Sequence, residues 1–138
     1  MATPSTPQVF TESGLQAACH TWFHNHHPKL RGLGFIIHND GAKHTIQAAQ
    51  DKARGLVPGI PDWCLMVPSG VTHHQVGVGT AAVYDHLALF VEFKVGRNGV
   101  DPLQAKRIAQ LQGQGYRVEV VRDLPTFQQL LTDYLSAA

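Results

Sequence analysis

Charged residues, cysteines and long apolar runs are all scarce in this sequence of 138 residues. The 11 Lys and Arg residues nearly balance the 10 Asp and Glu residues, and a net charge of +1 gives no general attraction to a polyanion. The two cysteines, Cys19 and Cys64, form neither a disulfide framework nor a zinc-binding spacing, so we expect two buried thiols. No apolar segment approaches the roughly 18 to 20 residues that cross a bilayer. Any affinity for nucleic acid must therefore come from local charge.

The composition is that of an ordinary folded domain, with 43% hydrophobic residues. Residues 1–10 carry Pro4 and Pro7 among small polar residues, without the basic start and apolar run of a signal peptide, so we expect a flexible tail there. We expect residues 11–138 to form a single domain. The protein is expected to be cytoplasmic and to have no membrane partner.

Hydrophobic periodicity and turn residues predict alternating helices and strands along the chain. A possible capping box formed by Ser13 and Gln16 places the first helix start at Thr11 or Ser13, and Asp101 is the expected cap of a later helix. The first helix is expected to end before Pro28, and further helices are expected at 45–54, 102–113 and 125–135. The expected strands cover 34–38, 63–67, 87–95 and 116–121, and residues 69–80 suggest a hairpin. This order predicts an α/β fold with a central mixed sheet flanked by helices.

Two charged residues stand inside the most apolar of these predicted strands. Side chains two residues apart on a strand share a face, so Glu92 and Lys94 project together while Phe93 projects oppositely. Burying an isolated charge costs several kcal/mol unless the charge is paired or binds an ion. The pair therefore indicates either a salt bridge or a functional site, and a single E-x-K triplet leaves the salt bridge open.

Asp62 stands at the start of another apolar strand and favours the functional interpretation. If the two strands are neighbours, Asp62 meets Glu92 across the sheet. Two carboxylates at one point are typical of a Mg²⁺ site that also accommodates a phosphate oxygen. Lys94 beside them would orient a water or stabilise charge on a phosphate. The pattern predicts hydrolysis of phosphodiester bonds with a divalent cation.

The same residues carry a family resemblance that extends over most of the chain. Its marks are the turn at 39–41, the stretch 55–62 ending in Gly-Ile-Pro-Asp, the Glu92-Phe93-Lys94 strand, Gln104 in the next helix, and Gly115 before the last strand. In this order they resemble the virus-type replication-repair nuclease domain (VRR-NUC), a branch of the PD-(D/E)xK superfamily. The resemblance implies a restriction-endonuclease-like fold and a nuclease that uses Mg²⁺ or Mn²⁺.

The resemblance also implies roles for individual residues. Asp62 and Glu92 are expected to bind metal together with the backbone carbonyl of Phe93, and Lys94 is the expected catalytic lysine. Gln104 matches a family position near the site, although its position three residues after Asp101 is equally explained by helix capping.

An acid from the first helix often completes the site of this family. Glu12 shares the inward-facing stripe of Leu15 and Cys19 and is the expected residue, with Gln16 one turn later as the alternative.

Residues 69–85 look like an insertion relative to the compact family pattern, which suggests a substrate loop or a dimer contact. Phage members resemble stand-alone homodimers that act on branched or structured DNA, so we expect the same partners for this chain.

Basic residues on both sides of the predicted site are the expected contacts of the DNA backbone. Arg97 follows the Lys94 strand directly. Lys29, Arg31 and Lys43 precede Asp62, as do Lys52 and Arg54, for which an ordinary solvated surface is an equally good explanation.

Two other functions compete with the nuclease. One is a module of the same fold that binds DNA or a protein without cutting. The other is a metal-binding protein that uses some of the nine histidines, among them His24, His26 and His27 near a helix end and the pair His73-His74. Only the nuclease interpretation requires weak Mg²⁺ or Mn²⁺ binding that depends on Asp62 and Glu92.

Overall fold

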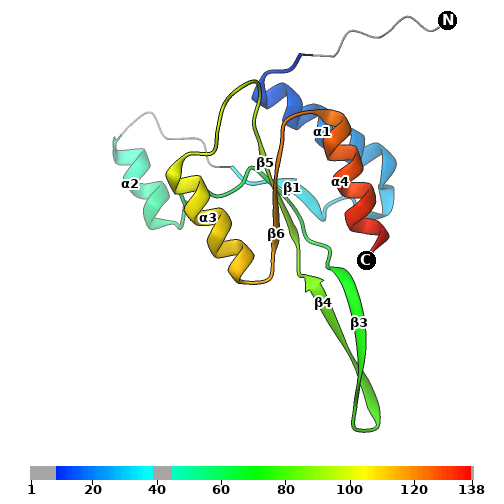
Figure 1. Ribbon diagram of the computed structural model, residues 1–138. Helices are drawn as coiled ribbons and strands as arrows, with labels where there is room; N and C mark the ends of the chain where they lie inside the picture. Colours follow the sequence, from blue (N-terminus) through cyan, green and yellow to red (C-terminus); the bar gives the residue numbers. More distant parts are fainter. Residues whose placement is uncertain (1–8, 39–44, 138) are drawn as a thin grey trace, which may run out of the picture.

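The computed structural model describes residues 9–38 and 45–137, in which a mixed sheet lies between helices (Figure 1). The sheet has the spatial order β1-β2-β5-β6. Its strands are β1 (Gly34–Ile36), β2 (Trp63–Leu65), β5 (Leu89–Phe93) and β6 (Arg117–Val121). The strands β1 and β5 run antiparallel to β2, whereas β6 runs parallel to β5. The predicted α/β architecture with a mixed central sheet is confirmed.

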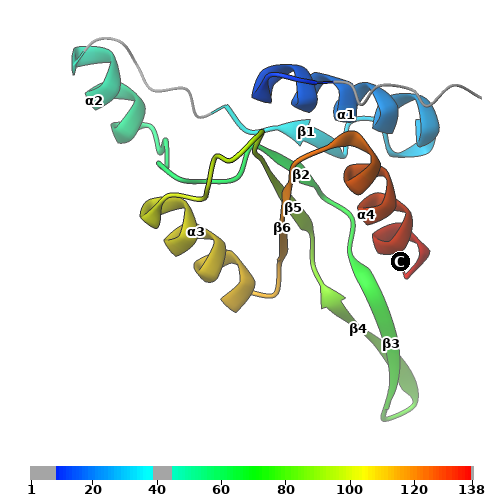
Figure 2. The ribbon, with the colours of Figure 1, turned by 45° about the horizontal axis from the view of Figure 1, so that its top comes forward.

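Helices cover both faces of this sheet (Figure 2). They are α1 (Glu12–His26), α2 (Thr45–Ala53), α3 (Pro102–Gly113) and α4 (Leu124–Ser136), with a short 3-10 turn, η1 (Pro28–Leu30). On one face α1 and α4 lie side by side, while α3 covers the other face beside β6. The predicted helices and strands are all found, but each sheet strand is shorter than predicted because periodicity reports burial, whereas a strand ends where its pairing ends.

The core forms around the indole of Trp63 on β2. Its ring packs edge-on against Phe23 of α1, with centroids 5.4 Å apart, and against Phe127 of α4, with centroids 5.3 Å apart. Such edge-to-face contacts contribute roughly 0.5–1.5 kcal/mol each beyond the burial of apolar area. Leu15 and Cys19 of α1 are fully buried beside them. The aromatic cluster therefore fixes α1 and α4 against the strand that follows Asp62.

Helix caps fix the positions of two candidate site residues, Glu12 and Gln104. The side chain of Thr11 accepts a hydrogen bond from the backbone N–H of Gly14 at 3.0 Å, so α1 begins at Glu12. The predicted capping box at Ser13 is therefore wrong, because Ser13 already lies inside the first turn. The predicted cap of α3 is confirmed, with Asp101 accepting from the N–H of Gln104 at 2.8 Å.

The predicted hairpin is longer than expected and projects away from the sheet (Figure 1, Figure 2). It consists of β3 (Ser69–Val76) and β4 (Gly79–His86), joined by a two-residue turn in which Gly77 has φ +57°. Its base is tied to α4, because Ser69 Oγ donates to the carbonyl of Tyr134 at 2.5 Å. Most of its length is exposed on both faces.

Some sequence-based expectations fall outside the described residues. These are most of the expected tail, residues 1–8, and the turn at 39–41. Within the described part, Cys19 and Cys64 are free and buried as predicted. Each helix there is too short or too polar to cross a membrane.

Gly34 lies where β1 crosses the aromatic cluster, and replacing it tests that packing. A Cβ atom at this position would lie 2.6 Å from Cζ2 of Trp63 and 2.7 Å from Cε1 of Phe23, so both rings would have to move. We expect Gly34→Ala to lower the free energy of unfolding by about 1–3 kcal/mol. Gly99→Ala is the matched control, since it meets no atom within 4 Å. Urea unfolding measures both, and equal stability of the two variants would contradict this packing.

Candidate active site

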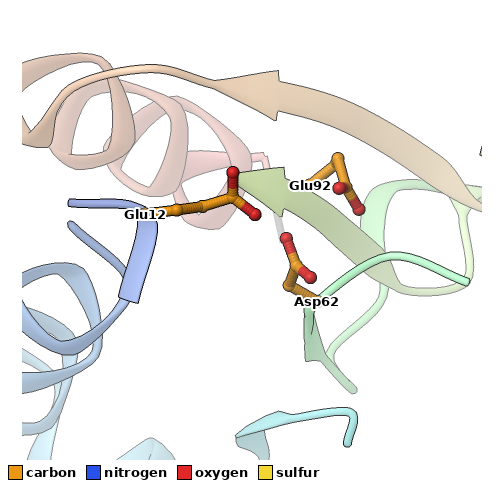
Figure 3. Close-up of side chains that lie close together, drawn as sticks. All are labelled: Glu12, Asp62 and Glu92. Atoms are coloured by element: carbon orange, nitrogen blue, oxygen red, sulfur yellow. The ribbon is translucent and has the colours of Figure 1, made fainter. Parts of the chain in front are cut away.

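Three carboxylates from distant parts of the chain converge at one end of the sheet (Figure 3). Glu12 comes from the first turn of α1, Asp62 immediately precedes β2, and Glu92 lies on β5. One oxygen of each carboxylate lies within 4.8 Å of the other two. The register pairs Trp63 with Val91, so the next position outward sets Asp62 opposite Glu92, as predicted from the sequence.

Of the two residues considered on α1, only Glu12 belongs to this group of carboxylates. Gln16 Nε2 instead donates to the backbone carbonyl of Asp62 at 3.5 Å. The difference follows from the cap at Thr11, which places Glu12 in the first turn of α1 and leaves Gln16 one turn further along the helix.

The backbone of β5 orients Asp62. The N–H of Phe93 donates to Asp62 Oδ2 at 2.8 Å. Because the N–H and C=O of one residue on a strand point to the same side, the carbonyl of Phe93 also lies on the side of β5 that faces Asp62. The backbone atom expected as a metal ligand therefore lies at the same end of the sheet as the carboxylates.

Glu92 is the most buried of the three acids, with 2% of its surface exposed. Burial raises the pKa of its carboxyl to about 7, the charge of Asp62 adds to the rise, and Lys94 opposes it. Lys94 Nζ lies 3.5 Å from Glu92 Oε1, and both side chains are largely withdrawn from water. The predicted pair is thus a buried ion pair inside a site with excess negative charge.

Gln104 connects this carboxylate to α3. Its Nε2 donates to Glu92 Oε1 at 2.9 Å, while its own Oε1 accepts from the N–H of Asp101 at 3.0 Å. The capping interpretation and the site interpretation of Gln104 are therefore both correct, because the two ends of one amide serve them separately. The helix cap fixes the position from which the amide reaches Glu92.

The segment before Asp62 is pressed against the first turn of α3. Gly59 has φ +82°, and a Cβ there would lie 2.9 Å from the carbonyl carbon and oxygen of Leu103. Arg107 Nε donates to the carbonyl of Pro58 at 3.2 Å and holds the same segment from the side. A glycine is required at such a close backbone approach. The Gly-Ile-Pro-Asp motif thus sets the distance between Asp62 and the helix that carries Gln104.

The carboxylates border a hollow of about 310 Å³. Residues 36–38 and Ile60 also form part of its wall, which the sequence alone did not indicate. The N–H of Ile37 donates to the carbonyl of Asp62 at 2.7 Å, so the pairing of β1 with β2 brings this wall to the site. The lining residues are Glu12, Ser13, Gln16, Ile36, Ile37, His38, Ile60, Asp62, Glu92 and Gln104.

The chemistry of the donors fits a hard divalent cation. Mg²⁺ and Mn²⁺ prefer carboxylate and carbonyl oxygens, which is the set that this site offers. Burial, and after it the charge of Asp62, raises the pKa of Glu92, so added positive charge would favour its ionised form. In the described part of the chain, no histidine belongs to a comparable group of ligands, and His20 Nδ1 instead accepts from Trp63 Nε1 at 3.1 Å.

The predicted basic contacts are not all brought to the site. Arg97 is exposed in the turn after β5, five positions beyond Glu92. Lys29 and Arg31 follow the opposite end of α1, about 20 Å from its first turn at 1.5 Å per residue. Lys43 lies outside the described residues.

Replacing Gly59 tests whether its close approach to α3 maintains the site. Gly55 is the matched control, because it also has a positive φ, +100°, but meets no atom within 4 Å. Both alanine variants are destabilised by the left-handed backbone conformation, whereas only Gly59→Ala also collides with the backbone of Leu103. We expect Gly59→Ala to lose roughly 1–3 kcal/mol more stability than Gly55→Ala in guanidinium unfolding. An equal loss in both variants would rule out the collision.

Comparison with known proteins agrees with this geometry. The sequence model of the VRR-NUC domain family matches residues 10–123, which include the three carboxylates, Lys94 and Gln104. A solved structure of a VRR-NUC domain protein superposes with a TM-score of 0.73 at 20% identity, over 95% of this chain and 93% of that chain, and supports the fold. None of the curated proteins matches the sequence. The fold is of the PD-(D/E)xK type, and the chain belongs to the VRR-NUC domain family.

Proposed function

We propose that this protein is an endonuclease that hydrolyses phosphodiester bonds in branched or structured DNA with Mg²⁺ or Mn²⁺. The junctions, flaps or nicks of phage replication, recombination or repair are the proposed substrates. The observation that carries the proposal is the convergence of Glu12, Asp62 and Glu92 beside a buried lysine. Membership in the VRR-NUC domain family, which indicates a nuclease-type function, supports it independently.

Asp62, Glu92 and Glu12 would hold the cation, together with the backbone carbonyl of Phe93. A bound Mg²⁺ or Mn²⁺ supplies a Lewis acid that acidifies water and neutralises charge on the phosphate. The N–H of Phe93 keeps one oxygen of Asp62 in a fixed direction, so this carboxylate is oriented before any ligand arrives. Such preorganisation avoids a cost at the moment of reaction.

Lys94 and Gln104 both act on the carboxylate of Glu92. Both engage the same oxygen, Oε1, and so fix the orientation of that carboxylate through one atom. The Lys94 side chain is 11% exposed. Its ammonium has three N–H donors, so donors remain for a phosphate oxygen or an attacking water. We assign Lys94 as the catalytic cation and Gln104 as the residue that positions Glu92.

Basic residues away from the carboxylates would position the DNA. Arg97 lies beyond the end of β5 and is assigned a phosphate near the cleaved bond. Lys29 and Arg31 are assigned phosphates farther along the same substrate, since α1 separates them from Glu12 by about 20 Å. Lys43 is assigned a further backbone contact. These contacts hold the DNA backbone without reading bases.

We also propose that the protein acts in the cytoplasm and that two copies of it act together as a homodimer.

Cleavage of labelled DNA tests the proposal. We expect the wild-type protein to cut four-way junctions or flaps with Mg²⁺ or Mn²⁺ and not with EDTA. Glu92→Ala and Lys94→Ala should each lower the rate at least about 100-fold, because each removes a charge at the reacting centre. Asp133→Ala on the exposed face of α4 is the control and should cut normally.

Binding of the same DNA in EDTA separates this proposal from its main alternative. Unchanged binding by Glu92→Ala with lost cutting is the expected pattern. If the wild-type protein binds these substrates but cuts neither them nor plain or nicked duplex, the protein is a binding module and the nuclease proposal fails.

A further inference from the structure

The strand β6 forms an edge of the sheet that no described strand covers. It pairs with β5 on one side, and α3 and α4 flank it without crossing its other side (Figure 1, Figure 2). An open edge of this kind presents unpaired backbone N–H and C=O groups that a further strand can engage.

The backbone directions along β6 determine which residues face outward. The N–H of Arg117 donates to the carbonyl of Ala88 at 3.0 Å, and the carbonyl of Val121 accepts from the N–H of Lys94 at 3.0 Å. The backbone N–H and C=O groups of the odd-numbered residues of β6 therefore point toward β5. Because these directions alternate along a strand, the N–H and C=O groups of Val118 and Val120 point away from the sheet. These are the groups that a second strand would meet.

The side chains of β6 carry opposite charges at alternate positions. Arg117 Nε lies 3.1 Å from Glu119 Oε1 on the face toward α4, with 34% and 42% of the two side chains exposed. This pattern is self-complementary when the strand meets an antiparallel copy of itself. A pairing centred on Glu119 would set two identical carboxylates opposite each other, which is unfavourable. A pairing centred on Val118 instead sets Arg117 opposite the Glu119 of the second copy, and does so twice.

The backbone agrees with the register centred on Val118. An outward-facing residue at the centre exchanges both of its hydrogen bonds with its own copy, which is the hydrogen-bonded pair of an antiparallel ladder. Arg117 and the second copy's Glu119 then occupy the non-hydrogen-bonded position, where facing side chains come closest. Charge and backbone direction thus select one register.

We propose that β6 pairs with β6 of a second copy of this chain, antiparallel and centred on Val118, so that two sheets join into one. The pairing locates the interface of the homodimer proposed above, and it does not depend on cutting activity. The two-fold axis stands perpendicular to the sheet, so both copies of Glu92 lie on the same face. Strand spacings of about 4.8 Å and a rise of about 3.4 Å per residue separate them by roughly 20 Å. Two such sites on one face suit a substrate with two strands to cut.

Charge reversal with a complementary mixture tests the interface. We expect the wild-type protein to sediment as a dimer, and Arg117→Glu and Glu119→Arg each to weaken the dimer at least tenfold, since like charges then face each other. An equimolar mixture of the two variants should form a heterodimer, because both facing pairs become complementary again. An ion pair that acts only within one chain cannot produce this rescue. Lys106→Glu on exposed α3 has the charge change of Arg117→Glu and should remain dimeric.

Cross-linking gives a second measurement that does not rely on charge. In the proposed register the Cα atoms of residue 117 and the second copy's residue 119 lie about 4.5 Å apart, within the range of a disulfide. A mixture of Arg117→Cys and Glu119→Cys should therefore cross-link under mild oxidation, whereas either variant alone should not. The native cysteines are buried and give no background.

A monomeric wild-type protein, single charge variants that remain dimeric, or a cysteine mixture that does not cross-link would each overturn the proposed interface. Capture of a strand from another protein predicts the first of these results. Because sedimentation and cleavage are measured separately, loss of this interface would leave the nuclease proposal standing, and loss of cutting would leave the interface standing.

Discussion

The burial of Glu92 is the constraint on which the candidate site depends. A carboxylate with 2% exposure and a pKa raised to about 7 is unfavourable when ionised, and Asp62 and Glu12 add to the negative charge around it. Lys94 and the amide of Gln104 offset part of that charge at one oxygen. The remaining charge is the physical reason why a divalent cation fits among the three acids.

The rest of the fold holds these groups at fixed distances. Trp63 packs between the aromatic rings of α1 and α4, which sets the first turn of α1, and therefore Glu12, beside the start of β2. On the other face, Gly59 allows the segment before Asp62 to touch the backbone of α3. Core packing and one glycine contact thus determine the geometry of acids that are far apart in the sequence.

Local periodicity was sufficient to predict some parts of this site. The two-residue repeat of a strand placed Glu92 with Lys94, and neighbouring strands brought Asp62 to them. The apolar stripe of the first helix likewise indicated that Glu12 faces inward. These predictions succeeded because each depends on a single element or on one pair of strands.

Features that depend on several elements together could not be predicted in this way. The pairing of β1 with β2 adds residues 36–38 to the wall of the hollow, and the separation of Lys29 from the acids follows from the direction of α1. Mn²⁺ titration followed by electron paramagnetic resonance tests most directly whether the three acids share one cation. A saturable Mn²⁺ site is expected in the wild-type protein and in Gln16→Ala, and it should be lost in Glu92→Ala. Unchanged Mn²⁺ uptake by Glu92→Ala would contradict the account.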